Sequence, residues 1–130
     1  MDNDSGTQDC HSVLMIDDDP THLQIYGWIL KSAGFTPCLA LARNDGVDLP
    51  KEEVIQVAVL DYRLTVGLKA TDAAQMVNEI FPGVPIILLS DVYGIPEDIA
   101  PYVKAFVRKG EPEKLIAMVK KFASTASNSE

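Results

Sequence analysis

The chain has 130 residues, of which 47% are hydrophobic, and this is enough for a single domain with a buried core. It carries 19 Asp and Glu against 11 Lys and Arg, and the net charge of −8 argues against nucleic-acid and membrane-surface partners. No apolar run approaches the length that spans a bilayer, so we expect no membrane segment.

The two ends of the chain are polar and poor in apolar residues. We expect residues 1–11 to form a disordered leader and residues 124–130 a disordered tail, with one domain over residues 12–123. The leader is acidic and does not resemble a secretory signal. Cys10 and Cys38 lack the Cys and His neighbours of a zinc site. Two cysteines placed in this way are typical of reduced thiols in a cytoplasmic protein rather than of a disulfide framework.

Five short apolar runs alternate with amphipathic stretches across the central domain. The runs show little polar alternation, which is typical of strands in a parallel sheet that is covered on both faces. They cover residues 13–16, 36–42, 55–60, 85–90 and 104–108.

Three of the intervening stretches have clear helical signals. Asp19 can cap a helix that begins at Pro20, because a carboxylate at the N-cap and a proline at the first position both favour a helix start. Thr71 or Asp72 can cap a second helix, and Pro112 opens a third.

The two remaining connections, over residues 47–53 and 93–102, contain prolines, so we expect only short or distorted helices there. Strands that alternate with helices predict an α/β domain. Its sheet would be doubly wound, parallel and five-stranded, with helices on both faces.

A polar residue stands at the end of four of the five predicted strands. Asp17 and Asp18 follow the first run, Asp61 follows the third, Ser90 ends the fourth and Lys109 follows the fifth. Ligands of a doubly wound sheet bind outside the carboxyl ends of its strands. We therefore expect three carboxylates, a hydroxyl and an ammonium group to meet at one edge.

Carboxylates crowded in this way repel one another unless a cation neutralises them. Mg²⁺ binds through carboxylates, carbonyl oxygens and waters, while a lysine and a hydroxyl can hold phosphate oxygens. A carboxylate can also act as a nucleophile and become an aspartyl-phosphate. The set predicts a phosphoryl-transfer site, and Asp19 is assigned to capping.

The segments MIDDDP, VLDYRL, PIILLS and FVRK resemble the receiver domains of bacterial two-component response regulators. The resemblance covers about residues 12–123 and implies the CheY-like, flavodoxin-like (βα)5 fold. It implies that Asp61 accepts a phosphoryl group from a histidine kinase or a histidine phosphotransfer protein. Asp17, Asp18, Asp61 and the backbone carbonyl of Arg63 would hold Mg²⁺ or Mn²⁺.

The same resemblance gives roles to three further residues. Lys109 would contact the phosphoryl group and Ser90 would hydrogen-bond to it. Phe106 would change rotamer together with Ser90, although a plain core phenylalanine is the alternative. The change would alter binding to a downstream protein partner. Because no output domain follows in this sequence, we expect a stand-alone receiver that acts as a switch rather than as a turnover enzyme.

The chain departs from the receiver pattern at several places, one of which is the loop after VLDYRL, where Thr65 and Ala70 replace the usual proline and glycine. Gly110 follows Lys109 where the family has a cis proline, and we expect a trans bond because a non-proline cis bond costs about 3 kcal/mol. Asp91 adds a negative charge at the mouth of the site. The segment over residues 94–101 replaces a regular helix on the face that the family uses for dimers, so we do not assume the usual dimer.

Two other interpretations stay open. The departures at Asp91 and Gly110 are compatible with a pseudo-receiver, a binding module that is not phosphorylated. The segment DDDPT also matches the D-x-D-x-T pattern of haloacid-dehalogenase-type phosphatases, with Asp17 as nucleophile and Asp19 as general acid. The helix start at Pro20 argues against a phosphatase, and so does the absence of a role for Asp61.

Overall fold

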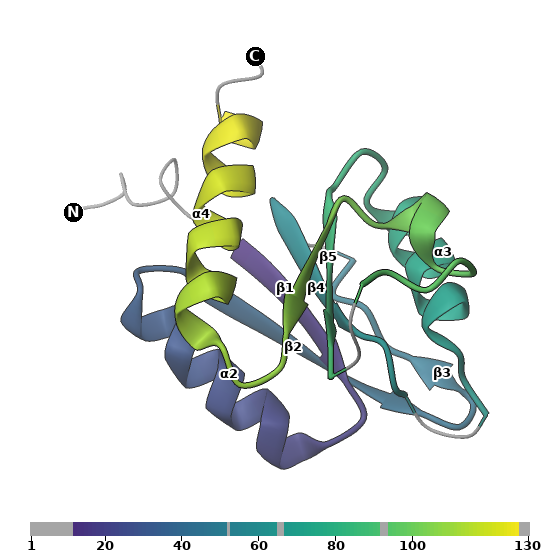
Figure 1. The fold of residues 1–130 in the computed structure, drawn as a ribbon. Helices are drawn as coiled ribbons and strands as arrows, with labels where there is room; N and C mark the ends of the chain where they lie inside the picture. The colour runs from purple at the N-terminus through teal and green to yellow at the C-terminus, as the bar shows by residue number, and fades with distance from the viewer. Residues whose placement is uncertain (1–11, 52, 65–66, 92–93, 128–130) are drawn as a thin grey trace.

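The apolar runs of the sequence form the strands of a central sheet, and the side chains of its three central strands are buried on both faces (Figure 1). The computed structural model describes residues 12–51, 53–64, 67–91 and 94–127. Its strands are β1 (Ser12–Asp17), β2 (Thr36–Arg43), β3 (Gly46–Val47), β4 (Val57–Asp61), β5 (Ile86–Ser90) and β6 (Ala105–Arg108).

The strands lie in the order β3-β2-β1-β4-β5-β6, and five of them are parallel. The expected count of five is wrong by one, because β3 adds a short antiparallel strand beside β2. The chain reverses after Arg43, and Gly46 follows the turn with φ +139°, a value that side chains disfavour. A two-residue strand is too short to produce a periodic signal in the sequence.

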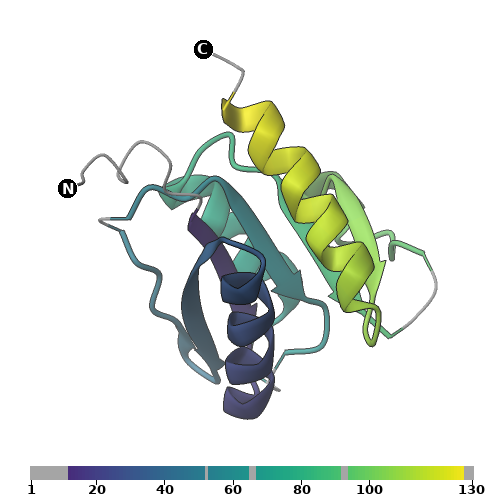
Figure 2. The same cartoon turned by 90° about the vertical axis from the view of Figure 1, so that its left-hand side faces the viewer.

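Helices cover both faces of the sheet. The helices α2 (Pro20–Ser32) and α4 (Pro112–Ser127) lie on one face, where Figure 2 shows both in front of the strands. The helix α3 (Ala70–Ile80) and the 3₁₀ turn η1 (Ala100–Tyr102) lie on the other face. Each face has its own cluster of buried apolar side chains, so the sheet separates two cores. None of the described helices combines the length and apolar character that a membrane crossing requires.

The helix starts follow the local signals in two cases of three. Oδ1 of Asp19 accepts a hydrogen bond from the backbone N–H of Thr21 at 2.9 Å, which confirms the cap of α2. The helix α4 begins at Pro112 as predicted. The cap predicted for α3 at Thr71 or Asp72 is wrong, because the helix begins at Ala70. Asp72 lies inside the first turn, and its side chain accepts a hydrogen bond from the backbone N–H of Lys69 at 3.1 Å.

The predicted disordered ends of the chain lie partly inside and partly outside the described residues. The helix α4 continues through Ser127, so the expected disordered tail is wrong over residues 124–127. The last three residues and the predicted leader, which includes Cys10, lie outside the described residues.

One of the two proline-containing connections is less helical than expected. Between β3 and β4 none of the described residues is helical, so the short helix predicted over 47–53 is wrong. Instead, Leu49 and Ile55 are buried in the core on the α3 side, where the segment covers the sheet directly. Among the described residues between β5 and β6, only the turn η1 is helical, which agrees with the distorted helix predicted there.

Candidate functional site

Two buried carboxylates face each other at the carboxyl ends of β1 and β4. These strands are parallel neighbours in which Ile16 pairs with Leu60, so the next residues, Asp17 and Asp61, emerge side by side. Asp17 is 0% exposed and Asp61 is 1% exposed. The exposed Asp18 completes the group, and ligand oxygens of the three residues lie within 4.8 Å of one another.

Burial and the closeness of the other carboxylates change the pKa of Asp17. Burial, together with the negative charge of Asp61, raises the pKa of Asp17 to about 8, although a hydrogen bond from the backbone N–H of Asp19 acts in the opposite direction. That bond is accepted by Oδ1 at 3.1 Å. Oδ2 is buried and receives no hydrogen bond from any described residue. A buried carboxylate in this state needs either a proton or a cation.

These residues fit a hard divalent cation. Three carboxylates at the stated separation supply the oxygen ligands that Mg²⁺ and Mn²⁺ prefer, and Oδ2 of Asp17 is an acceptor that lacks a donor among the described residues. The sequence-predicted metal residues Asp17, Asp18 and Asp61 are therefore brought together as expected. Their role as ligands stays a prediction.

Lys109 supplies the positive charge of the site. Its Nζ lies 3.1 Å from Oδ1 of Asp61, and the same oxygen accepts the backbone N–H of Arg63 at 3.2 Å. Burial lowers the pKa of Lys109, but the hydrogen bond to Asp61 and the charges of Asp61, Asp17 and Asp91 outweigh it, and the pKa is raised. The ammonium is thus held in its charged form against the carboxylate of Asp61.

The loop that carries Lys109 is anchored to the end of β5. The backbone N–H of Lys109 donates to the carbonyl of Ser90 at 2.8 Å, and the Ser90 side chain is buried. No described peptide bond is cis, so the Lys109–Gly110 bond is trans as predicted. Gly110 has φ +86°, which lets the chain turn sharply from β6 toward α4. The roles of Ser90 and Lys109 toward a phosphoryl group stay predictions.

An exposed ion pair stands at the mouth of the site. Nε of Arg63 lies 3.6 Å from Oδ1 of Asp91, which joins the residues that follow β4 and β5. The added negative charge of Asp91 is therefore offset by a nearby cation. The backbone of Arg63 lies beside Asp61, because its N–H donates to that side chain. Metal binding by the Arg63 carbonyl stays a prediction.

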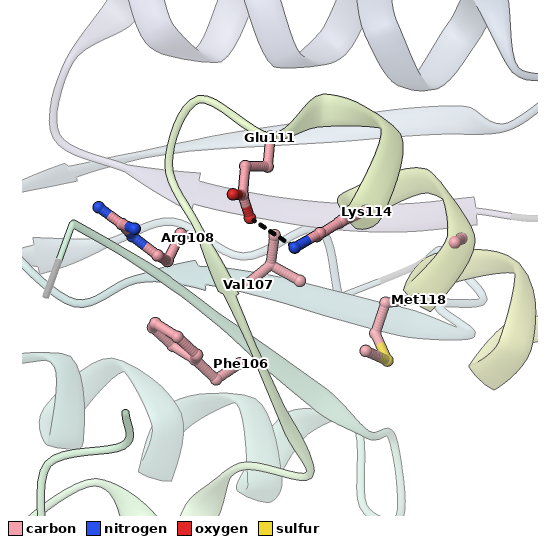
Figure 3. A pocket seen from close by; sticks show the side chains of 7 residues that line it. Phe106, Val107, Arg108, Glu111, Lys114 and Met118 are labelled. Carbon is pink, nitrogen blue, oxygen red and sulfur yellow. Dashed lines mark ion pairs between the residues drawn. The ribbon is translucent and has the colours of Figure 1, made fainter. Parts of the chain in front are cut away.

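Phe106 lies on the opposite face of β6 from the helix α4. Figure 3 shows Phe106 and Val107 projecting to opposite sides of the strand, as neighbours on a strand do. Phe106 packs at the margin of the core on the α3 side. In the register of β5 with β6 it pairs with Leu88, whereas Ser90 pairs with Arg108. The geometry therefore agrees with a core phenylalanine, and the switch role stays a prediction.

The sequence-based site missed His22. This residue lies in the first turn of α2, and its Nδ1 is 3.5 Å from Oδ2 of Asp17. The signal was present in MIDDDPTH, since a helix that starts at Pro20 brings its first turn back to the end of β1. One histidine on a helix is a weak signal without knowledge of the helix direction. Cys38, by contrast, belongs to no group of metal-ligand side chains among the described residues.

Comparison with known proteins places the chain near the response regulators. No protein-family model matches it. The transcriptional regulatory proteins GlrR of Escherichia coli K12 and QseF of Escherichia coli O157:H7 are each 28% identical over 91 residues. That match covers 68% of this chain and 20% of either relative, so the chain spans about a fifth of the length of the curated relatives it matches.

Solved structures agree over nearly the whole chain. A CheY-like receiver domain protein from Methanospirillum hungatei JF-1 superposes with a TM-score of 0.77 at 21% identity, covering 93% of this chain and 99% of that one. The BeF3-activated receiver domain of DrrB, a response regulator of Thermotoga maritima, superposes with a TM-score of 0.70 at 26% identity, covering 88% and 98%. The resemblance seen in the sequence motifs is thereby confirmed: the chain has the fold of CheY-like receiver domains, and its curated relatives are response regulators.

Proposed function

We propose that the protein is a signalling switch in which Asp61 accepts a phosphoryl group from the phosphohistidine of a histidine kinase or a histidine phosphotransfer protein. One observation carries the proposal. Asp61 is buried between two further carboxylates and the Lys109 ammonium at the carboxyl edge of a receiver fold. No other group of three potential metal ligands occurs among the residues that the structure describes.

The proposed step exchanges one bond for another. A bond forms between a carboxylate oxygen of Asp61 and phosphorus, and the phosphorus–nitrogen bond of the donor histidine breaks. The donor leaves as neutral imidazole, because its other ring nitrogen keeps a proton. Lys109 holds Oδ1 of Asp61 and stabilises negative charge that moves toward the acceptor. Catalysis is largely positioning, so a switch is a better description than a turnover enzyme.

A divalent cation would complete the site. Asp17, Asp18 and Asp61 would hold it together with the backbone carbonyl of Arg63, and Mg²⁺ or Mn²⁺ suits these oxygen donors. When bound, the cation would neutralise the carboxylates and the phosphoryl oxygens. Without such a cation, the charge repulsion between Asp17 and Asp61 opposes the approach of an anionic donor.

The output would be a shift between two conformations. The hydroxyl of Ser90 would hydrogen-bond to the new phosphoryl group, and Phe106 would move with it to change the surface offered to a downstream protein. We place this switch in the cytoplasm and assign the receiver domain to residues 12–127, since α4 extends to Ser127. The expectation of no nucleic-acid partner has no support, because the curated relatives are transcriptional regulatory proteins of much greater length.

Intact mass after incubation with Mg²⁺ and acetyl phosphate tests the proposal. We expect one phosphoryl group on the wild-type chain and none on Asp61→Asn. Asp48→Asn is a matched control, because Asp48 is an exposed carboxylate whose partner, Arg43, lies outside the site. This variant should gain the adduct as the wild type does.

The two alternatives give different results in the same experiment. A pseudo-receiver forms no adduct with any donor. A phosphatase uses Asp17 as nucleophile and turns over phosphate monoesters, with Asp19 as its general acid. The structure favours the receiver over the phosphatase, because Asp19 is engaged in the cap of α2 and the helix follows β1 directly.

A further inference from the structure

His22 and Asp17 place two buried polar atoms opposite each other. Nδ1 of His22 and Oδ2 of Asp17 are 3.5 Å apart, and neither has a hydrogen-bond partner among the described residues. Leaving a buried donor or acceptor without a partner is costly, so such a pair calls for a shared proton, a water or an ion. A cation between the two atoms would satisfy both.

We propose that His22 is a further ligand of the cation site and presents Nδ1 beside Asp17 as a nitrogen donor. This inference rests on the proposed function, since it concerns the same cation. The mutually close ligand oxygens are those of Asp17, Asp18 and Asp61. His22 adjoins this group on the Asp17 side, with Nδ1 3.5 Å from Oδ2 of Asp17.

The other ring nitrogen of His22 also has a carboxylate near it. Nε2 lies 3.8 Å from Oδ2 of Asp19, and Asp19 is fixed in place because its Oδ1 caps the helix. A histidine that binds a metal commonly directs its second nitrogen at a carboxylate. In His22, Nδ1 lies beside the buried carboxylate of Asp17, and Nε2 lies on the side of Asp19 at a distance that allows an ion pair but is longer than a hydrogen bond.

The helix start makes this placement possible. Pro20 and the Asp19 cap begin α2 two residues after Asp18, so the first turn lies directly against the end of β1. A cavity of about 360 Å³ adjoins the ring, and Lys109 also lines it. The ring therefore borders this cavity and also lies beside the carboxylate of Asp17.

A nitrogen donor changes which cations the site prefers. Mg²⁺ favours oxygen ligands, whereas Co²⁺ and other transition-metal ions accept imidazole readily. The three carboxylates alone suit Mg²⁺, so removal of His22 should act mainly on transition metals. If His22 only formed an ion pair with Asp17, its removal would change the affinities for Mg²⁺ and for Co²⁺ alike.

Calorimetric titration with Mg²⁺ and with Co²⁺ separates these cases. The chain has two histidines, so all proteins carry His11→Gln to remove the other imidazole. In that background we expect His22→Gln to weaken Co²⁺ binding by about tenfold or more. Mg²⁺ binding should change by less than about threefold, since its oxygen ligands remain. Circular dichroism verifies that the variant is folded.

A matched control restores the imidazole at a different position. Gln24 is exposed on the same helix, so adding Gln24→His to His22→Gln returns a histidine without returning it to the site. This protein should keep the weakened Co²⁺ binding. Pulsed electron paramagnetic resonance of bound Mn²⁺ provides a second readout, in which the nitrogen coupling of a coordinated imidazole should be present with His22 and lost with His22→Gln.

The outcomes distinguish this inference from the proposed function. If both cations weaken equally or neither weakens in His22→Gln, His22 is not a ligand and the inference is overturned, while Mg²⁺ binding still supports the receiver site. Absence of nitrogen coupling in the protein with His22 would also overturn it. If neither cation binds before His22 is changed, the inference and the proposed cation site fail together.

Discussion

Nζ of Lys109 lies 3.1 Å from Oδ1 of Asp61, and this pair joins the end of β4 to the loop after β6 across the intervening strand β5. The contact places a cation against a carboxylate that is already close to Asp17. The charge balance of the site therefore depends on three strands that are distant in sequence. Changes at any of them should affect stability, cation binding and phosphorylation in separable ways.

Lys109→Met should destabilise the metal-free protein, because Asp61 and Asp17 would lose the cation that offsets their repulsion. Combining it with Asp61→Asn should recover part of the loss, with a coupling energy of about 1–3 kcal/mol. Urea unfolding of the wild type, the two single variants and the double variant measures this coupling. Strict additivity of the two changes would show that the pair contributes nothing to stability.

The pH dependence of stability should carry the signature of Asp17. In the metal-free folded protein its pKa is raised to about 8 from 3.8, so the folded state keeps a proton that the unfolded chain has released. This contribution to the free energy of unfolding is complete below the unfolded pKa and is lost as the pH rises through about 8.

Urea unfolding in the presence of EDTA checks the sign of this effect. Stability relative to Asp17→Asn should fall between about pH 4 and pH 8, because the variant has no proton to lose at this position. Addition of Mg²⁺ should restore wild-type stability most strongly at the upper end of that range. Parallel pH profiles for the two proteins would contradict the raised pKa.

Asp18→Asn should separate metal binding from folding. Asp18 is exposed, so the substitution should change metal-free stability by less than about 0.5 kcal/mol. A cation at about 100 times its Kd stabilises the wild type by about 2.7 kcal/mol, and most of this increment should be missing in the variant. Thermal unfolding with and without Mg²⁺ measures the increment, and Asp48→Asn is the exposed-carboxylate control. An undiminished increment in Asp18→Asn would remove Asp18 from the ligand set.

Arg63→Ala should shorten the lifetime of the phosphorylated protein. Arg63 stands at the mouth of the site and pairs with Asp91, so its side chain can limit the access of water to Asp61. We expect the barrier to hydrolysis to fall by about 1 kcal/mol, roughly a fivefold increase in rate. Decay of the adduct followed by intact mass provides the measurement. Asp91→Ala should shift the rate in the same direction, because it releases Arg63, and an unchanged rate in both variants would refute the shielding role.

Some features of the site could be predicted because they depend on neighbours in sequence. A carboxylate that directly follows an apolar run marks the end of a buried strand, which located Asp17 and Asp61. Parallel strands align their carboxyl ends, so these residues had to meet once the sheet was parallel. The cap of α2 was equally local, since Asp19 bonds to a backbone group only two residues away.

Other features were decided only by the packing of the whole chain. No periodic pattern marks the edge strand β3 or the segment between β3 and β4. The course of that segment was determined by the burial of Leu49 and Ile55 against the sheet. The approach of His22 to Asp17 required the direction of α2 relative to β1, and the Lys109–Asp61 contact required the order of three strands. Local residue patterns thus determined where strands end and helices begin. Distances between side chains followed from tertiary packing, because they depend on elements that are far apart in sequence.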